Sequence, residues 1–400
     1  MACSHSFSSS LSLLLALGLL AACADDSRDG TEIIVSDDNT ADTAQGGSAA
    51  PWLDASEIAD IEARADRLVA AGVPGVSVAV ISGSQTVLIA RGVADRTTGE
   101  PMTPDHRFRV ASMSKSVVAS VVLQLVEEGK IGLSDQVGDW LPGMLTENTD
   151  ASIENLLRLE SGIFNYEEDE RHMAPYFAGD FEYSWSPEGL VGLAADHPAM
   201  FEPGTKFYYS NTNFVLLALI VQKIEADTLA NVVRRRITAP LGMSASSMPI
   251  GSELESPYAH GYMLGLGDEP VDVSAISASS VFGNGNLVAT ARDAALFYGA
   301  LARGELVGPQ QLPGMLATHD GVDTHYGMGV WRWDHSGLVP CARIVGHDGA
   351  APGYDTTAFS NLEGTRQYAV LANVLAPGDV VGDEAAQQAW KELVRAAACN

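Results

Sequence analysis

The chain has 400 residues, of which 46% are hydrophobic and 18% are charged, so it has enough apolar surface to bury a large core. Its 51 acidic residues against 23 basic ones give a formal net charge of −28, which would repel phosphate backbones and anionic lipid headgroups. Nucleic-acid binding is therefore excluded as a main role, and four cysteines are too few for a disulfide-rich scaffold of this length.

The N-terminal residues 1–22 are typical of an export signal. Residues 11–22 form a twelve-residue apolar run that is too short for a membrane-spanning helix of about 20 residues. The run ends in Leu20-Ala21-Ala22-Cys23, and small residues before a cysteine resemble a bacterial lipobox, where the signal is cut and the thiol carries lipid. We expect a lipoprotein signal peptide, with the protein exported and anchored to the bacterial cell envelope through Cys23. An ordinary signal peptide with a chance cysteine is the alternative.

Residues 23–51 are acidic and rich in Ser, Thr and Gly, and they are interpreted as a flexible tether between the membrane and a folded body. Export would also determine which cysteines are left to form a disulfide, because Cys3 is removed with the signal peptide and Cys23 is lipidated. Cys341 and Cys399 then remain as a pair in an oxidising compartment, which favours a disulfide that ties the C-terminal helix to a strand. Two free buried thiols are the alternative.

The folded body begins with the apolar spacing of an amphipathic helix over residues 54–71, followed by a β-hairpin over residues 76–81 and 86–92. Further helices are predicted over residues 112–128, 152–159, 212–225, 291–303 and 383–398, and further strands over residues 327–333, 342–345, 356–360 and 367–373. Strands at both ends of the chain around a helical middle predict an α/β domain interrupted by a helical insert. We place the α/β domain at residues 52–118 and 285–400, and the insert at residues 119–284.

The first motif that carries chemistry is Ser112-Met113-Ser114-Lys115, at the start of an apolar helix. Residues three apart lie on one helix face, so the amine of Lys115 can reach the hydroxyl of Ser112. The helix dipole and burial both disfavour the ammonium form, so a neutral Lys115 could accept the Ser112 proton. Only this lysine has a serine three residues before it. A solvated cap serine beside a surface lysine is the alternative.

The second motif is Tyr209-Ser210-Asn211, and no other tyrosine of the chain has Asn two residues later. A tyrosine near a nucleophile can move protons, and an Asn side chain can hold a substrate amide. A packed turn that opens a helix is the alternative.

The third motif has the pattern His-x-Gly, which occurs at several places, among them His319, His335 and His347. Only His347-Asp348-Gly349 lies between two strand-like segments, and an edge strand there could bind an extended substrate by backbone hydrogen bonds.

In this order the three motifs resemble those of the serine β-lactamase and penicillin-binding protein superfamily, nearest to class C β-lactamases and D-alanyl-D-alanine carboxypeptidases. The resemblance extends from about Trp52 to Cys399. It also includes Thr103-Pro104, Leu156 and the residues after it up to Gly162, Pro240-Leu241-Gly242-Met243, and Pro352-Gly353-Tyr354. It implies an antiparallel sheet flanked by the N- and C-terminal helices, with a mostly helical inserted domain.

The resemblance also implies acyl transfer, in which Ser112 attacks a carbonyl and forms an acyl-enzyme while Lys115 and Tyr209 move the protons. The residues that would bind the substrate are Asn211, His347, Gly349 and Ala350. Asn211 would orient the substrate amide, and His347 would take the place of the usual third-motif cation. The backbone N–H groups of Ser112 and Ala350 would form the oxyanion hole.

One departure from the superfamily pattern bears on the substrate. Asp348 stands where penicillin-recognising relatives commonly have Thr or Ser, and an ionised carboxylate facing the site would repel the carboxylate of such substrates. The sequence therefore predicts an exported serine hydrolase, most like a D-alanyl-D-alanine carboxypeptidase or β-lactamase, acting on D-amino acyl peptides or β-lactams. The alternatives are a carboxylesterase, a D-aminopeptidase or amidase of the same fold, and a non-catalytic relative that binds cell-wall peptide.

The sequence lacks the motifs of other catalytic classes. There is no His-Glu-x-x-His metal motif and no Gly-x-Ser-x-Gly elbow, and Gly283-Asn284-Gly285-Asn286 lacks the lysine and the strand–helix frame of a phosphate loop. We interpret that glycine-rich segment as a turn that approaches the site, and we expect neither a metal nor another cofactor.

Overall fold

The computed structural model describes residues 30–35, 53–265, 269–318, 325–334, 341, 343–375 and 382–399, and for residues 30–35 only the backbone. The predicted signal peptide and Cys23 lie outside the described residues, as do His319 and His335. In the described part of the chain, none of the helices has both the length and the apolar character needed to span a bilayer.

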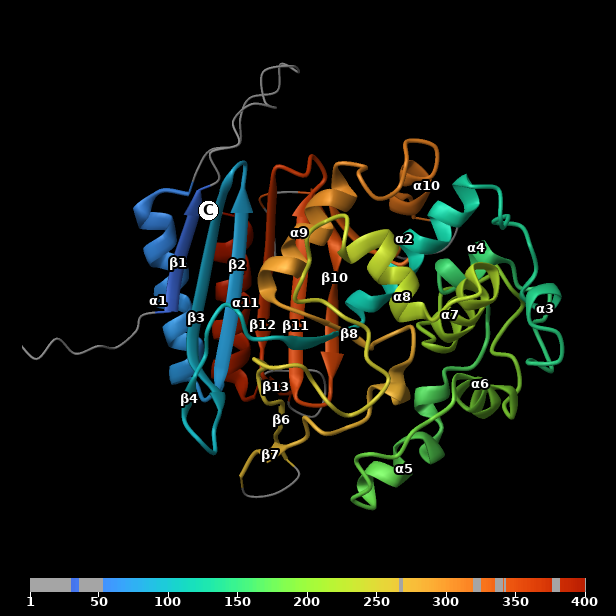
Figure 1. Ribbon diagram of the computed structural model, residues 1–400, viewed down its shortest axis with the longest axis horizontal. Coiled ribbons are helices and arrows are strands. Elements are labelled where there is room, and N and C mark those ends of the chain that lie inside the picture. The colour runs from blue at the N-terminus through green and yellow to red at the C-terminus, as the bar shows by residue number, and fades with distance from the viewer. Residues whose placement is uncertain are drawn as a thin grey trace, which may run out of the picture.

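An antiparallel sheet of eight strands forms the larger layer of the fold, on the left of Figure 1. Its strands are β1 (Gly30–Val35), β2 (Gly75–Ser82), β3 (Gln85–Asp95), β4 (Glu100–Pro101), β9 (Trp331–Asp334), β10 (Arg343–Ala351), β11 (Tyr354–Asn361) and β12 (Arg366–Ala372). Their order is β1-β3-β2-β12-β11-β10-β9, with β4 paired to β3. Because β12 pairs with β2, the sheet joins the two ends of the chain, as the sequence predicts.

Helices cover both faces of this sheet. Strand β2 is therefore buried at every position. Val76, Val78 and Val80 pack in the core cluster that includes α1 (Ala55–Ala70) and α11 (Glu384–Cys399). Ala79 and Ile81 point to the opposite face, in the core cluster that includes α2 (Met113–Glu127) and α9 (Ala291–Ala302). A strand buried on both faces requires the continuous apolar run that this segment has.

The second part of the fold is mostly helical and lies to the right in Figure 1. Its elements are α3 (Val137–Trp140), α4 (Ile153–Leu157), the 3-10 turn Tyr166–Glu168, α5 (Glu170–Phe177), α6 (Pro187–Ala195), α7 (Thr212–Glu225) and α8 (Leu229–Val233). Two small sheets, the π-helical turn Arg234–Thr238, the 3-10 turn Ala278–Val281 and α10 (Leu312–Leu316) complete the described fold. The sheets are β5 (Phe108–Ala111) with β8 (Leu287–Ala289), and β13 (Val374–Leu375) with β6 (Tyr262–Met263) and β7 (Val271–Asp272). The predicted fold class is thus confirmed, whereas the residue limits of the two domains stay a prediction.

The structure corrects two details of the sequence prediction. Residues 30–35, predicted to belong to a flexible tether, form β1 and pair with the edge of β3. The β-branched run Ile33-Ile34-Val35 favours this strand, so the tether prediction is wrong for these six residues. Strand β10 is also longer than predicted, and it contains the whole His347-Asp348-Gly349 motif.

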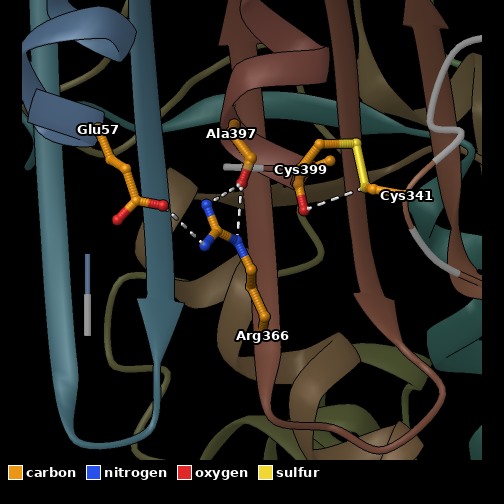
Figure 2. The surroundings of a disulfide bond; sticks show 6 residues. Glu57, Cys341, Arg366, Ala397 and Cys399 are labelled. Atoms are coloured by element: carbon orange, nitrogen blue, oxygen red, sulfur yellow. Dashed lines mark hydrogen bonds and ion pairs between the residues drawn. A yellow bond between two sulfur atoms is a disulfide. The ribbon is translucent and has the colours of Figure 1, made fainter. Parts of the chain in front are cut away.

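The C-terminal helix is fastened to the sheet at its last turn, as Figure 2 shows. Cys341 and Cys399 form a disulfide, with their Cα atoms 5.5 Å apart. Close by, Nε and Nη2 of Arg366 donate hydrogen bonds to the carbonyl oxygen of Ala397 at 3.3 and 3.1 Å. Nη1 of Arg366 lies 4.0 Å from a Glu57 carboxylate oxygen on α1. The disulfide and this arginine together hold α11 beside α1 and β12.

Replacing both cysteines (Cys341→Ser with Cys399→Ser) should lower the free energy of unfolding by roughly 2–5 kcal/mol, because the bond closes a long loop and restricts the unfolded chain. Urea unfolding measures the loss. As a control, a reductant should lower the stability of the unmodified protein to the same level and leave the double variant unchanged. Equal stability of the double variant and the oxidised protein would contradict the prediction.

Candidate active site

Ser112 lies at a tight junction between β5 and α2. The preceding residue, Ala111, has a φ of 47°, a left-handed conformation that is unfavourable for a residue with a Cβ. Ser114 supports this turn, because its hydroxyl donates to the carbonyl oxygen of Ala111 at 2.7 Å and accepts the Leu287 N–H at 2.9 Å. Ser112 occupies the N-cap position of α2, but its side chain makes no capping hydrogen bond. Its hydroxyl is therefore available for other contacts.

Lys115 is fully buried one turn along α2, and its Nζ lies 2.9 Å from Oγ of Ser112. The same nitrogen donates to the carbonyl oxygen of Asn284 at 3.2 Å, so the Gly283–Asn286 segment does approach the site. Burial lowers the pKa of Lys115 to about 7, although the negative charges of Glu167 and Asp348 oppose this shift. Within the described residues no carboxylate forms an ion pair with Lys115. A large fraction of this lysine is thus neutral near neutral pH and can accept a proton.

Tyr209 lies beside the same pair of residues. Nζ of Lys115 is 4.8 Å from the centroid of the Tyr209 ring, and the ring stacks on Trp331 of β9 with an interplanar angle of 6°. Burial raises the pKa of Tyr209 well above its usual range, while a hydrogen bond with the Ser112 side chain acts in the opposite direction. The side chain therefore stays a neutral phenol, which can give a proton to a leaving group and receive one from Lys115.

The opposite wall of the site comes from the helical part of the fold. Asn211 lies at the N-terminus of α7, where its backbone N–H donates to Oδ1 of Asn165 at 3.1 Å and its side chain makes no capping bond. Half-buried Glu167 lies on the neighbouring 3-10 turn, and its carboxylate accepts the Tyr166 hydroxyl at 3.2 Å. The adjacent Glu168 instead accepts the Tyr208 hydroxyl at 2.7 Å. Of these two glutamates, only Glu167 lines the cleft.

The third wall is the end of β10, which extends beyond its neighbour β9. Strand β9 pairs with Arg343–Gly346 only, so on that side residues 347–351 have no strand partner among the described residues. His347 is buried, and its Nε2 lies 3.3 Å from the Tyr326 hydroxyl. Gly349 has no room for a side chain, because a Cβ there would lie 2.4 Å from the carbonyl oxygen of Val110. Glycine thus allows β10 to pass directly against β5, next to Ser112.

A cleft of about 140 Å³ opens between these walls. It is lined by Ala111, Ser112, Glu167, His172, Met173, Asn211, Ile276, Ser280, Val281, Asn284, Gly285, Ala350, Ala351 and Pro352. The predicted residues Ser112, Asn211 and Ala350 face it, while Lys115, Tyr209 and His347 gather around the Ser112 side of the cleft. The structure therefore brings the three sequence motifs to one place.

Sequence reasoning missed two polar groups of this site. Glu167 belongs to no recognisable motif, and its place in the cleft depends on the tertiary packing of the 3-10 turn. Ser114 lies inside the first motif, but only the structure shows that it supports the strained turn at Ala111.

Similarity to known proteins identifies the family. Residues 61–389 match the family model described as Beta-lactamase, and the chain therefore belongs to this family. It is a serine hydrolase of the β-lactamase and penicillin-binding protein type.

Three similar proteins show the range of activities among relatives. Penicillin-binding protein 4* of Bacillus subtilis (strain 168) is 27% identical over 306 residues, which are 70% of this chain and 64% of that protein. A D-aminopeptidase of Brucella anthropi is 27% identical over 314 residues, 73% of this chain and 56% of that protein. The crystal structure of a D-stereospecific amidohydrolase from Streptomyces sp. has a TM-score of 0.75 at 29% identity, covering 85% of this chain and 98% of that one.

The lowered pKa of Lys115 predicts how the reactivity of Ser112 depends on pH. Only the neutral amine accepts a proton, so the rate of covalent labelling by a fluorophosphonate should rise with pH and reach half its maximum at about pH 7. The variant Lys115→Met should label roughly 10²–10⁴-fold more slowly and lack this midpoint. Stopped-time labelling between about pH 5 and 9 measures both rates. A rate that does not change with pH would contradict the role of Lys115.

Proposed function

We propose that the protein hydrolyses D-aminoacyl amides and peptides through an acyl-enzyme on Ser112. The observation that carries this proposal is the uncapped Ser112 hydroxyl, 2.9 Å from the buried Lys115 amine, in a cleft that also contains the carboxylate of Glu167. Ser, Lys and Tyr in this arrangement are the groups that nucleophilic acyl transfer needs.

In the proposed reaction, neutral Lys115 takes the Ser112 proton while Oγ forms a bond to the substrate carbonyl carbon. The negative oxygen of the tetrahedral intermediate would be stabilised by the backbone N–H groups of Ser112 and Ala350. The C–N bond then breaks, and the leaving amine takes a proton passed on by Lys115 and Tyr209. A water molecule next attacks the ester, which releases the acid and restores the Ser112 hydroxyl.

The carboxylate of Glu167 favours a substrate whose acyl group carries a free ammonium. Within the described residues no lysine or arginine forms an ion pair with this half-buried carboxylate, so a substrate cation would supply the missing charge. The apolar side chains of Met173, Ile276 and Val281 line the same cleft and would accommodate an apolar D-side chain. The similarity to a D-aminopeptidase and to a D-stereospecific amidohydrolase is consistent with such a substrate.

A D-alanyl-D-alanine carboxypeptidase or β-lactamase is the second candidate, favoured by the similarity to penicillin-binding protein 4*. Substrates of these enzymes carry a carboxylate close to the reacting carbonyl. The charges of Glu167 and Asp348 both act on Lys115 and would oppose such a group. We therefore place this activity second.

The proposed function predicts that the purified protein hydrolyses D-phenylalanine amide much faster than L-phenylalanine amide, with liquid chromatography of the products as the assay. Ser112→Ala should abolish the reaction. Glu167→Gln should lower kcat/KM roughly 10–100-fold, because it removes a charged hydrogen bond to the substrate ammonium. The matched variant Glu168→Gln changes the neighbouring carboxylate, which does not line the cleft, and should have little effect.

Labelled penicillin separates the two candidates in the same preparation. Rapid adduct formation on Ser112 without amide hydrolysis would favour the second candidate. A protein that neither hydrolyses the amide nor forms an adduct with penicillin or a fluorophosphonate would contradict both.

We further propose that the protein is a lipoprotein of the cell envelope, anchored through Cys23. This proposal rests on the apolar run at residues 11–22 and on the small residues before the cysteine. In bacteria fed radiolabelled palmitate, the full-length protein should carry label in the membrane fraction, and Cys23→Ser should lose the label. Unlabelled protein with an unmodified Cys23 would contradict the anchor.

A further inference from the structure

Asp348 lies between His347 and Gly349, in the end of β10 that pairs with β11 but extends beyond β9. Its side chain is 70% exposed, and Oδ1 lies 3.4 Å from Nδ1 of His347. A hydrogen bond from the side chain of Trp331 of β9, whose donor is the indole N–H, contributes to lowering the pKa of Asp348. Partial desolvation raises the pKa of Asp348, but the contacts with His347 and Trp331 outweigh it and the net shift is downward. The carboxylate is therefore ionised at neutral pH.

Within the described residues no lysine or arginine forms an ion pair with Asp348, so its charge is not neutralised by a permanent cation. The charge also acts on the reacting groups, because it opposes the lowered pKa of Lys115 and contributes to the raised pKa of Tyr209. Asp348 is thus a negative charge close to the catalytic pair.

The position of Asp348 indicates whether the leaving group or the acyl group of a bound substrate lies next to it. The leaving amine must take its proton from Lys115 or Tyr209, and the Tyr209 ring centroid lies 6.5 Å from that of His347 and 6.4 Å from that of Trp331. His347 contacts Asp348 directly, and the Trp331 side chain contributes to lowering its pKa. Glu167, by contrast, belongs to the opposite wall with Asn211. A bound substrate would therefore have its leaving group near Asp348 and its acyl group near Glu167.

We propose that Asp348 determines specificity for the leaving group: it disfavours a carboxylate next to the scissile bond and favours a cation there. The inference rests on the proposed function, since it assigns the leaving-group side of the same cleft. It predicts an enzyme that prefers amides, peptide amides and amine-bearing leaving groups to dipeptides with a free carboxylate.

Coulomb's law gives the expected size of the effect. Two like charges about 6 Å apart, with an effective dielectric constant of about 40, disfavour binding by roughly tenfold relative to a neutral partner. An opposite charge in the same place favours binding by a similar factor. Both effects should weaken as salt is added, because Asp348 is exposed and its field is screened.

The test compares three substrates that share the D-phenylalanyl group. D-phenylalanyl-D-alanine carries a carboxylate on the leaving group, D-phenylalanyl-D-alaninamide is its neutral isostere, and N-(2-aminoethyl)-D-phenylalaninamide carries a cation. For the full chain at low salt, kcat/KM should rise in this order by on the order of tenfold per step.

Substitutions at Asp348 should change the ratios between these substrates in a defined way. Asp348→Asn should reduce each ratio towards one, and Asp348→Lys should reverse the order. The control Glu363→Gln removes an equally exposed carboxylate between β11 and β12 and should leave the ratios unchanged. Because the measured quantity is a ratio, a partial loss of folded protein in one variant does not alter it.

The outcomes separate this inference from the proposed function. Hydrolysis of all three substrates with ratios near one, or ratios that Asp348→Asn leaves unchanged, would overturn the role of Asp348 and leave the proposed function intact. Failure of the wild-type protein to hydrolyse any D-phenylalanyl substrate would overturn the proposed function, and this inference with it.

Discussion

The proposed chemistry depends on a lysine amine that is buried against a serine hydroxyl and forms no ion pair with any described carboxylate. Helix α2 is enclosed by apolar neighbours over most of its length, so Lys115 cannot reach water. Desolvation is then the largest influence on its pKa, and it outweighs the attraction of the two nearby carboxylates. The same burial that makes the ammonium costly makes the neutral amine a base for Ser112. Burial of Lys115 in the core is thus the reason why Ser112 is reactive.

A close approach of backbone segments positions these groups. The left-handed conformation of Ala111 turns the chain sharply from β5 into α2, and Ser114 holds that turn by two hydrogen bonds. Gly349 lets β10 pass against β5 at a distance that no side chain would allow. The result is that Ser112 and the end of β10 beyond β9 face one cleft, with the carboxylate of Glu167 on the helical wall. Asp348 on β10 adds a negative charge that acts on Lys115.

The sequence predicted the parts of this arrangement that depend on local geometry. The spacing of Ser112 and Lys115 fixes their contact once the segment is helical, and the alternation of strands and helices was enough for the fold class. The convergence of Tyr209 and His347 on that pair required the family resemblance, because their separation along the chain carries no distance information. Glu167 could not be predicted, since a glutamate on a short turn is common and only tertiary packing places it in the cleft. Strand β1 was missed because its acidic, polar surroundings outweighed a short β-branched run.

The most direct test of the central claim is an NMR titration of the lysine side chains with ¹³C at Cε. The chain has only five lysines, so their signals can be assigned by single substitutions such as Lys115→Arg. The account predicts that one signal, absent from Lys115→Arg, titrates at about pH 7. A Lys115 signal that titrates near the ordinary lysine value of about 10 would contradict the claim that this amine is the base.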